Sequence, residues 1–165
     1  MVFKLIPAIV CSVLLNGACK RDMKKIDEYH QELWTAEADE NLDRINHALI
    51  RQWRSAENKA EFEFPSAGPT PAKVVCGKRP HEPDSDLWNT NGWQTLRFRI
   101  NKPFRYQYQV ISHGKGKNAR FTIRAHGDLD CDGVWSTYEM WGAIDEKGNV
   151  HNFDGKKFDE EKAAE

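Results

Sequence analysis

A stretch without proline or glycine, from Met23 to Asn58, constrains the fold of this chain more than any other feature. Apolar side chains recur along it at intervals of three or four residues, at Trp34, Ala38, Leu42, Ile45, Leu49, Trp53 and Ala56. This is the period of an α-helix that buries one stripe of its surface, whereas a half-buried strand would alternate every second residue. The pattern therefore predicts one long amphipathic helix, which needs an apolar layer to pack against.

A segment rich in proline and glycine, residues 62–92, follows the helix. It contains Pro65, Pro69, Pro71, Pro80 and Pro83 with Gly68 and Gly77. Because proline ends helices and glycine permits sharp turns, this composition predicts an irregular crossover instead of another packed helix. Trp88 and Trp93 lie at its end; such side chains either stack on a ligand or fasten an irregular segment to the core, and we expect the second role.

Beyond the crossover, apolar and polar residues alternate with the period of half-buried strands. The apolar positions fall in four runs: Leu96, Phe98 and Ile100; Phe104, Tyr106, Tyr108 and Val110; Phe121, Ile123 and Ala125; and Tyr138, Met140 and Ile144. Turn-forming residues separate the runs, so consecutive strands are expected to pair antiparallel. We predict an α+β fold in which one long N-terminal helix packs on an antiparallel meander of about four strands.

The first nineteen residues have the features of an export signal. Lys4 precedes a mostly apolar run, Leu5 to Leu15, which is too short to span a bilayer and is followed by Asn16-Gly17-Ala18-Cys19. This ending resembles a bacterial lipoprotein signal, in which the cysteine is lipidated and becomes the new N-terminus, although such signals usually carry leucine where Asn16 stands. Cleavage without lipid and an uncleaved apolar anchor are the alternatives, and all three predict an exported protein.

These features divide the chain into four predicted segments. Residues 1–18 are a signal peptide, residues 19–37 a lipidated tether or the start of the helix, residues 38–153 the folded domain, and residues 154–165 a charged flexible tail.

Export assigns separate roles to the four cysteines. Cys11 lies in the signal and Cys19 is the lipidation site, which leaves Cys76 and Cys131 as an even pair in an oxidising compartment. We expect a disulfide between them, with two unrelated buried thiols as the alternative, because the geometry of pairing cannot be read from sequence. Neither cysteine has a ligand spacing that suggests zinc.

An acidic loop has the spacing of a calcium site. Carboxylates stand at loop positions one, three, five and twelve, a glycine at six, a backbone carbonyl at seven and a hydroxyl at nine: Asp128, Asp130, Asp132, Glu139, Gly133, Val134 and Ser136. Ca²⁺ prefers six to eight oxygen ligands, which this pattern supplies. An EF-hand needs helices on both sides, whereas these flanks are predicted strands, so Glu139 is the ligand most able to point elsewhere. A solvated acidic turn is the alternative.

Charge and motifs argue against two other classes of protein. The net charge of −1, from 24 basic and 25 acidic residues, provides no basic field for nucleic acid. Ser136 has no Gly-x-Ser-x-Gly context, and the six histidines are scattered, so an extracellular hydrolase has no motif behind it. His126 is expected to end a strand, where it either covers Trp135 or acts as a base. We expect a protein that is not an enzyme.

Taken in order, these features resemble the globular part of type IV pilin-like and pseudopilin-like proteins over residues 38–153. The resemblance rests on the helix, the crossover with Gly68-Pro69-Thr70-Pro71 and Cys76-Gly77, the segment Trp93-Gln94-Thr95-Leu96-Arg97-Phe98, the strand Phe104-Arg105-Tyr106-Gln107-Tyr108, and above all the loop Gly127-Asp128-Leu129-Asp130-Cys131-Asp132-Gly133. It implies a pilin-like arrangement of helix and sheet. Cys131 replaces a glycine usual in this loop, which fits a disulfide with Cys76.

The N-terminus departs from the pilin pattern. Pilins carry a short basic leader, a processing glycine and then an apolar helix, whereas here the apolar run precedes the expected cleavage point and Lys20-Arg21-Asp22 follow it. We therefore expect an exported pilin-like protein, anchored by lipid to the inner or outer membrane of a bacterial cell envelope. On the periplasmic side or at the cell surface, it would act as a structural or interaction module, with pilus or secretion-system proteins as the expected partners. The alternative is a true minor pilin or pseudopilin of a type IV pilus or type II secretion system.

Overall fold

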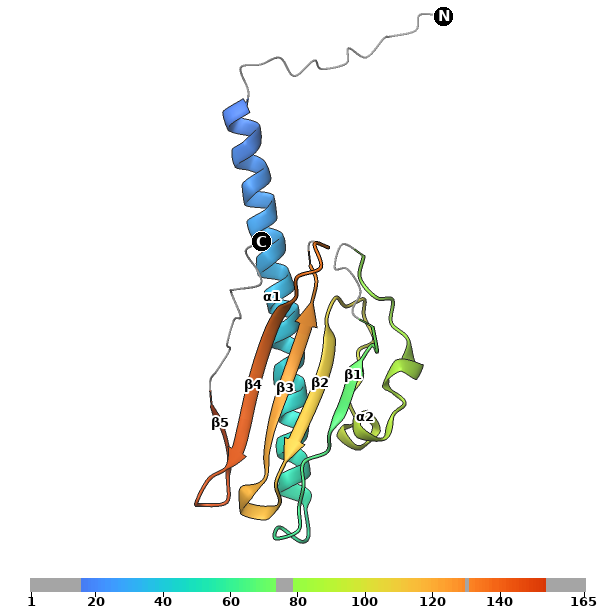
Figure 1. Ribbon diagram of the computed structural model, residues 1–165, viewed down its shortest axis with the longest axis vertical. Coiled ribbons are helices and arrows are strands. Elements are labelled where there is room, and N and C mark those ends of the chain that lie inside the picture. The colour runs from blue at the N-terminus through green and yellow to red at the C-terminus, as the bar shows by residue number, and fades with distance from the viewer. Residues whose placement is uncertain (1–15, 74–78, 130, 154–165) are drawn as a thin grey trace, which may run out of the picture. The chain divides into compact units, whose positions relative to one another are not determined.

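The computed structural model describes residues 16–73, 79–129 and 131–153 (Figure 1). Its regular elements are α1 (Asn16–Ser55), β1 (Ala67–Thr70), η1 (Ser85–Trp88), α2 (Asn91–Leu96), β2 (Gln107–His113), η2 (Gly116–Asn118), β3 (Arg120–Gly127), β4 (Ser136–Ile144) and β5 (Val150–Phe153). The chain divides into two units, Met1–Thr35 and Ala36–Glu165, which are described separately. The predicted tail and most of the predicted signal lie outside the described residues.

Helix α1 confirms the long helix and its buried stripe. Within the second unit, all apolar stripe residues that belong to the helix are at least 94% buried: Ala38, Leu42, Ile45, Leu49 and Trp53. The segment predicted as tether or helix start, residues 19–37, lies within α1. No helix among the described residues is both long enough and apolar enough to cross a membrane.

The sheet is an antiparallel meander of five strands in the order β1-β2-β3-β4-β5. Its inner face carries the apolar residues that the alternation selected: Tyr108, Val110, Phe121, Ile123, Ala125, Tyr138, Met140 and Ile144, all buried. In Figure 1 the strands lie in front of the second-unit part of α1, so that the core is enclosed between this helix and the inner face. The α+β class and the helix-on-sheet packing are confirmed.

Two strands were missed by the sequence prediction. Strand β1 lies inside the proline-rich crossover and includes Pro69, which an edge strand tolerates because one side of its backbone makes no ladder hydrogen bonds. Strand β5 follows the Asp145–Gly148 turn and is the opposite edge. The predicted strand at Phe104 begins later, at Gln107, because Phe104 forms an isolated bridge with His81 instead.

The prediction of a strand over residues 96–100 was wrong. Leu96, Phe98 and Ile100 are buried as the alternation suggested, yet helix α2 ends at Leu96 and no strand follows. The reason is that side chains of α1 take the place of a neighbouring strand. Arg44 Nη2 donates a hydrogen bond to the Arg99 carbonyl at 2.9 Å. The alternation of apolar and polar residues in this segment therefore results from burial against a helix and not from pairing with a strand.

The crossover tryptophans fasten this segment to the core. Trp88 and Trp93 are 2% and 0% exposed, and their rings meet edge to face with centroids 5.3 Å apart. Trp93 Nε1 also donates a hydrogen bond to Thr70 Oγ1, at 2.7 Å, which ties α2 to strand β1. The expected structural role of both side chains is confirmed.

We predict that Gly92→Ala lowers the free energy of unfolding by about 2 kcal/mol, because overpacking of a rigid contact typically costs 1–3 kcal/mol. A Cβ atom at Gly92 would overlap the carbonyl oxygen of Ser66 and lie 2.7 Å from Ala67 Cβ. The Ser66 oxygen belongs to the backbone and Ala67 Cβ is attached directly to it, so neither can turn aside and α2 must move. Urea unfolding measures the effect, with the exposed α2 residue Gln94→Ala as control. Equal urea midpoints of unfolding for Gly92→Ala and wild type would contradict this close packing of α2 against β1.

Candidate functional site

The acidic loop connects β3 to β4, and two of its aspartates bind the loop's own backbone. Asp128 accepts hydrogen bonds from the N–H groups of Cys131 and Gly133, at 2.8 and 3.2 Å. Asp132 Oδ1 accepts one from the N–H of Val134 at 2.7 Å. These carboxylates hold the reversal of the chain in place. Asp130 lies outside the described residues.

Of the other predicted calcium ligands, Val134 precedes β4 in the loop, whereas Ser136 and Glu139 are strand residues. Ser136 pairs with Gly127 where β3 and β4 meet the loop, and Glu139 stands opposite Arg124 further along the same pair of strands. Glu139 Oε1 accepts a hydrogen bond from Arg124 Nε in an ion pair. The twelfth position of the loop thus points toward Arg124, as the strand flanks suggested. Among the described residues, which exclude Asp130, no three His, Cys, Asp or Glu side chains are grouped to hold a metal ion.

Calcium binding by this loop stays a prediction. If Ca²⁺ displaces the loop amides from Asp128 and Asp132, the folded state gains RT ln(1 + [Ca²⁺]/Kd), about 2.7 kcal/mol at one hundred times Kd. The melting temperature in millimolar calcium should then be higher than that in chelator. Asp128→Asn or Asp132→Asn should abolish this difference. Glu139→Gln is the control and should keep it, because Glu139 is paired with Arg124. Identical melting temperatures in calcium and in chelator would contradict calcium binding, and the loop would then be a solvated acidic turn.

Of the predicted cysteine sites, the structure describes only Cys131. Cys131 is disulfide-bonded and adopts a positive φ of 73° in the acidic loop. Cys76 lies outside the described residues, so the pairing of Cys76 with Cys131 stays a prediction. Cys19 falls within the range of α1, but its side chain is not described, and its lipidation stays a prediction as well.

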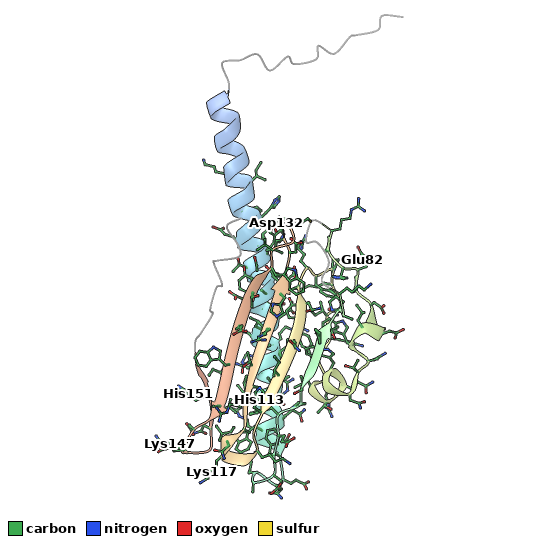
Figure 2. All side chains as sticks on the ribbon, viewed as in Figure 1. Glu82, His113, Lys117, Asp132, Lys147 and His151 are labelled. Carbon is green, nitrogen blue, oxygen red and sulfur yellow. The ribbon has the colours of Figure 1, made fainter. Side chains whose placement is uncertain are left out.

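The outer face of the sheet, opposite α1, carries a candidate binding site that the sequence prediction missed. A cleft of about 620 Å³ is lined by His113, Lys117, Arg120, Thr122, Glu139 and Trp141, among others. Trp141 is 43% exposed and stands directly opposite Thr122 on β3. Figure 2 shows His113 and Lys117 near one end of the sheet and Asp132 near the other, so this outer-face cleft is distinct from the acidic loop.

Charge in the outer-face cleft is mostly positive. Lys117 and Arg120 are exposed at its rim, while the carboxylate of Glu139 is neutralised by Arg124. A half-exposed indole beside two cations can stack on a flat or apolar group and bind an adjacent anion. This arrangement suits the binding of a partner surface.

His126 covers Trp135, which was one of its two predicted roles. Their ring centroids are 5.8 Å apart, and His126 Nδ1 is 2.9 Å from Thr137 Oγ1. Partial burial lowers the pKa of His126, and the nearby Arg124 guanidinium lowers it further. The imidazole is therefore neutral at physiological pH and packs against an indole.

One sequence signal points to the outer-face cleft. In β4 the apolar residues Tyr138, Met140 and Ile144 alternate, and Trp141 is a large aromatic at a position where the alternation calls for a polar side chain. An aromatic on the wet face of a strand is a reason to look for a binding surface. No family model matches the chain, and no curated protein or solved structure matches it either.

Proposed function

We propose that this chain is an exported, lipid-anchored and non-catalytic interaction module of a bacterial cell envelope, built on a pilin-like domain. Support for export and lipidation comes from the apolar run Leu5 to Leu15 and the following Gly17-Ala18-Cys19. Support for the pilin-like arrangement comes from the long helix packed on an antiparallel sheet. The proposed partners are the membrane, through the lipid, and proteins of a pilus or secretion machine.

The observation that carries the interaction role is the outer-face cleft with Trp141. The second-unit part of α1 covers one face of the sheet, whereas the other face presents an indole that is 43% exposed between charged side chains. Tryptophan and arginine contribute most often to the binding energy of protein interfaces. Trp141 and Arg120 are therefore the residues expected to anchor a partner.

A true minor pilin or pseudopilin is the second candidate, and α1 itself favours it. The helix includes Asn16, so it begins within the segment predicted to be a signal. In the first unit, Ile26, Tyr29 and Leu33 are 54%, 59% and 49% exposed. Their spacing of three and four residues places them along one side of the helix, as in a helix that packs against other helices.

Cell fractionation tests the lipid anchor. Acyl chains supply most of the membrane affinity of a lipoprotein, so Cys19→Ser should release the protein into soluble fractions or block its processing. Cys11→Ser, the same change inside the predicted signal, should fractionate as wild type. A processed Cys19→Ser protein that stays with the membrane would contradict the anchor. Co-purification of that variant with sheared filaments would favour the minor pilin.

In-cell photo-crosslinking tests the interaction surface. A photoreactive residue at position 141 should give discrete crosslinked species, because a partner seated in the outer-face cleft lies within its reach. The same residue at Lys147, an exposed position in the β4–β5 turn, is the control and should give none. Equal crosslinking at both positions, or at neither, would contradict an interface centred on Trp141.

A further inference from the structure

A second concave surface of the folded unit lies between the last turns of α1 and helix α2. A cleft of about 830 Å³ is lined there by Arg51, Arg54 and Arg97, with Gln94 among the polar residues. A smaller hollow of about 350 Å³ shares Arg97 and Gln94 with this cleft and adds Arg99. We call the two together the arginine cleft. None of its lining residues belongs to the outer-face cleft.

The four arginines of this cleft lack acidic partners in the described part of the chain. Arg51, Arg54, Arg97 and Arg99 are exposed, and no described carboxylate lies within 4.0 Å of their guanidinium groups. The lining of the arginine cleft contains no aspartate or glutamate. Elsewhere in the fold, described cations do find partners, in the pairs Lys102–Glu40, Arg105–Glu37, Lys115–Glu63 and Arg124–Glu139. Four arginines without an acidic partner therefore line one concavity of a chain with a net charge of −1.

The backbone places Arg97 where the two hollows meet. Arg97 is the C-cap of α2 and has φ 52° and ψ 42°, the left-handed conformation that glycine usually occupies at this position. A residue with a Cβ is strained there. The conformation nevertheless puts a guanidinium, which glycine would lack, at the junction of both hollows.

A structural role explains only part of the cluster. Arg54 lies in the last turn of α1, where a cation favourably meets the negative end of the helix dipole. Arg51 precedes it by three residues and so lies on the same side of the helix, which adds repulsion between like charges. Neither consideration accounts for Arg97 and Arg99. A bound anion would relieve the repulsion among all four, and guanidinium groups bind phosphate oxygens in a bidentate manner.

We infer that the arginine cleft binds a phosphate-bearing ligand with at least two negative charges. Its two hollows share Arg97, and each is lined by at least one further arginine, so that phosphate groups joined in one ligand can be bound together. Free polyphosphate anions and the headgroup of cardiolipin, which joins two phosphates in one lipid, share this chemistry.

Calorimetric titration of the full chain with inorganic tripolyphosphate tests the inference. At low salt we expect binding that weakens as salt is added, because exposed charges are screened. The double variant Arg51→Gln/Arg54→Gln should lose affinity by about tenfold or more, since hydrogen bonds between charged groups contribute strongly. The control, Lys73→Gln/Lys147→Gln, removes the same charge from exposed positions outside both clefts and should change affinity less than about twofold if binding is local.

Arg97→Gly separates loss of the guanidinium from loss of folding. Glycine adopts the left-handed conformation without strain, so the melting temperature should rise while the affinity for tripolyphosphate falls. Equal losses of tripolyphosphate affinity in the two double variants would overturn the inference.

Vesicles distinguish the two sources of phosphate. An acyl anchor inserts into neutral and anionic bilayers alike, so the readout is the difference in binding between vesicles that contain cardiolipin and vesicles of phosphatidylcholine alone. A preference for cardiolipin that Arg51→Gln/Arg54→Gln removes supports the site and identifies a lipid headgroup. Tripolyphosphate binding without that preference supports the site and identifies a free ligand. Failure with both probes overturns it.

Discussion

Replacement of Trp93 by alanine is expected to lower the free energy of unfolding by about 4 kcal/mol, within the range found when large buried aromatics are truncated. Trp93 is 0% exposed, and its ring lies 5.3 Å from the rings of both Trp88 and Phe98. Truncation removes this packing and also leaves the hydroxyl of Thr70, buried within the crossover, without its indole donor. Urea unfolding monitored by circular dichroism measures the loss.

Trp141→Ala is the matched control for this prediction. The same atoms are removed, but from a side chain that is 43% exposed on the outer face of the sheet. Its effect on unfolding should be about half that of Trp93→Ala or less, because nearly half of this indole is already exposed to water. Similar losses in the two variants would mean that Trp93 is not the main attachment of the crossover.

Cys131→Ser should lower the free energy of unfolding by about 2 to 4 kcal/mol, the usual contribution of a disulfide that limits the unfolded chain. The bond at Cys131 ties the acidic loop to another part of the chain. If Cys76 is the partner, Cys76→Ser should have the same effect, and the double variant should lose no more than either single one. A reductant should lower the free energy of unfolding of the wild-type protein to that of the variants.

Thiol labelling checks the pairing independently of stability. In the unfolded but unreduced protein, a thiol reagent should leave Cys76 and Cys131 unmodified. Labelling at both positions would contradict the bridge. Full stability of Cys76→Ser beside a destabilised Cys131→Ser would assign the bond to a different cysteine.

The sequence predicted those parts of the fold in which side-chain period and secondary structure have the same cause. A helix that packs on a sheet must place its apolar residues every three or four positions, and Leu42, Ile45 and Leu49 do so. Strands β3 and β4 were predicted for the corresponding reason, because one face is buried and the other is wet.

The prediction failed where a segment is buried like a strand but its backbone hydrogen bonds are not made with a neighbouring strand. Phe98 and Ile100 alternate like strand residues, but their segment packs against α1 and receives hydrogen bonds from helix side chains. The helix stripe also hides a polar contact. Asn41 is 0% exposed and donates a hydrogen bond from Nδ2 to Tyr108 Oη at 2.9 Å. A pattern of apolar residues cannot indicate a buried amide whose partner is 67 residues away.

The candidate sites divide in the same way. The acidic loop is a local motif, so its position between two strands could be predicted from spacing alone, whereas the pairing of Glu139 with Arg124 depends on the register of β3 and β4. The arginine cleft is not local at all. Arg51 and Arg97 line the same cleft only because α2 docks beside the end of α1, and no sequence spacing relates them.

The mass of the native protein, purified from the membranes of the cells that produce it, tests the central claim most directly. Export with lipidation predicts an N-terminus at Cys19 that carries acyl chains, with residues 1–18 absent, and a mass two hydrogens lower than that of the reduced protein because of one disulfide. An N-terminal peptide that retains the apolar run Leu5 to Leu15, or one that begins at an unmodified Cys19, would contradict the lipid-anchored module.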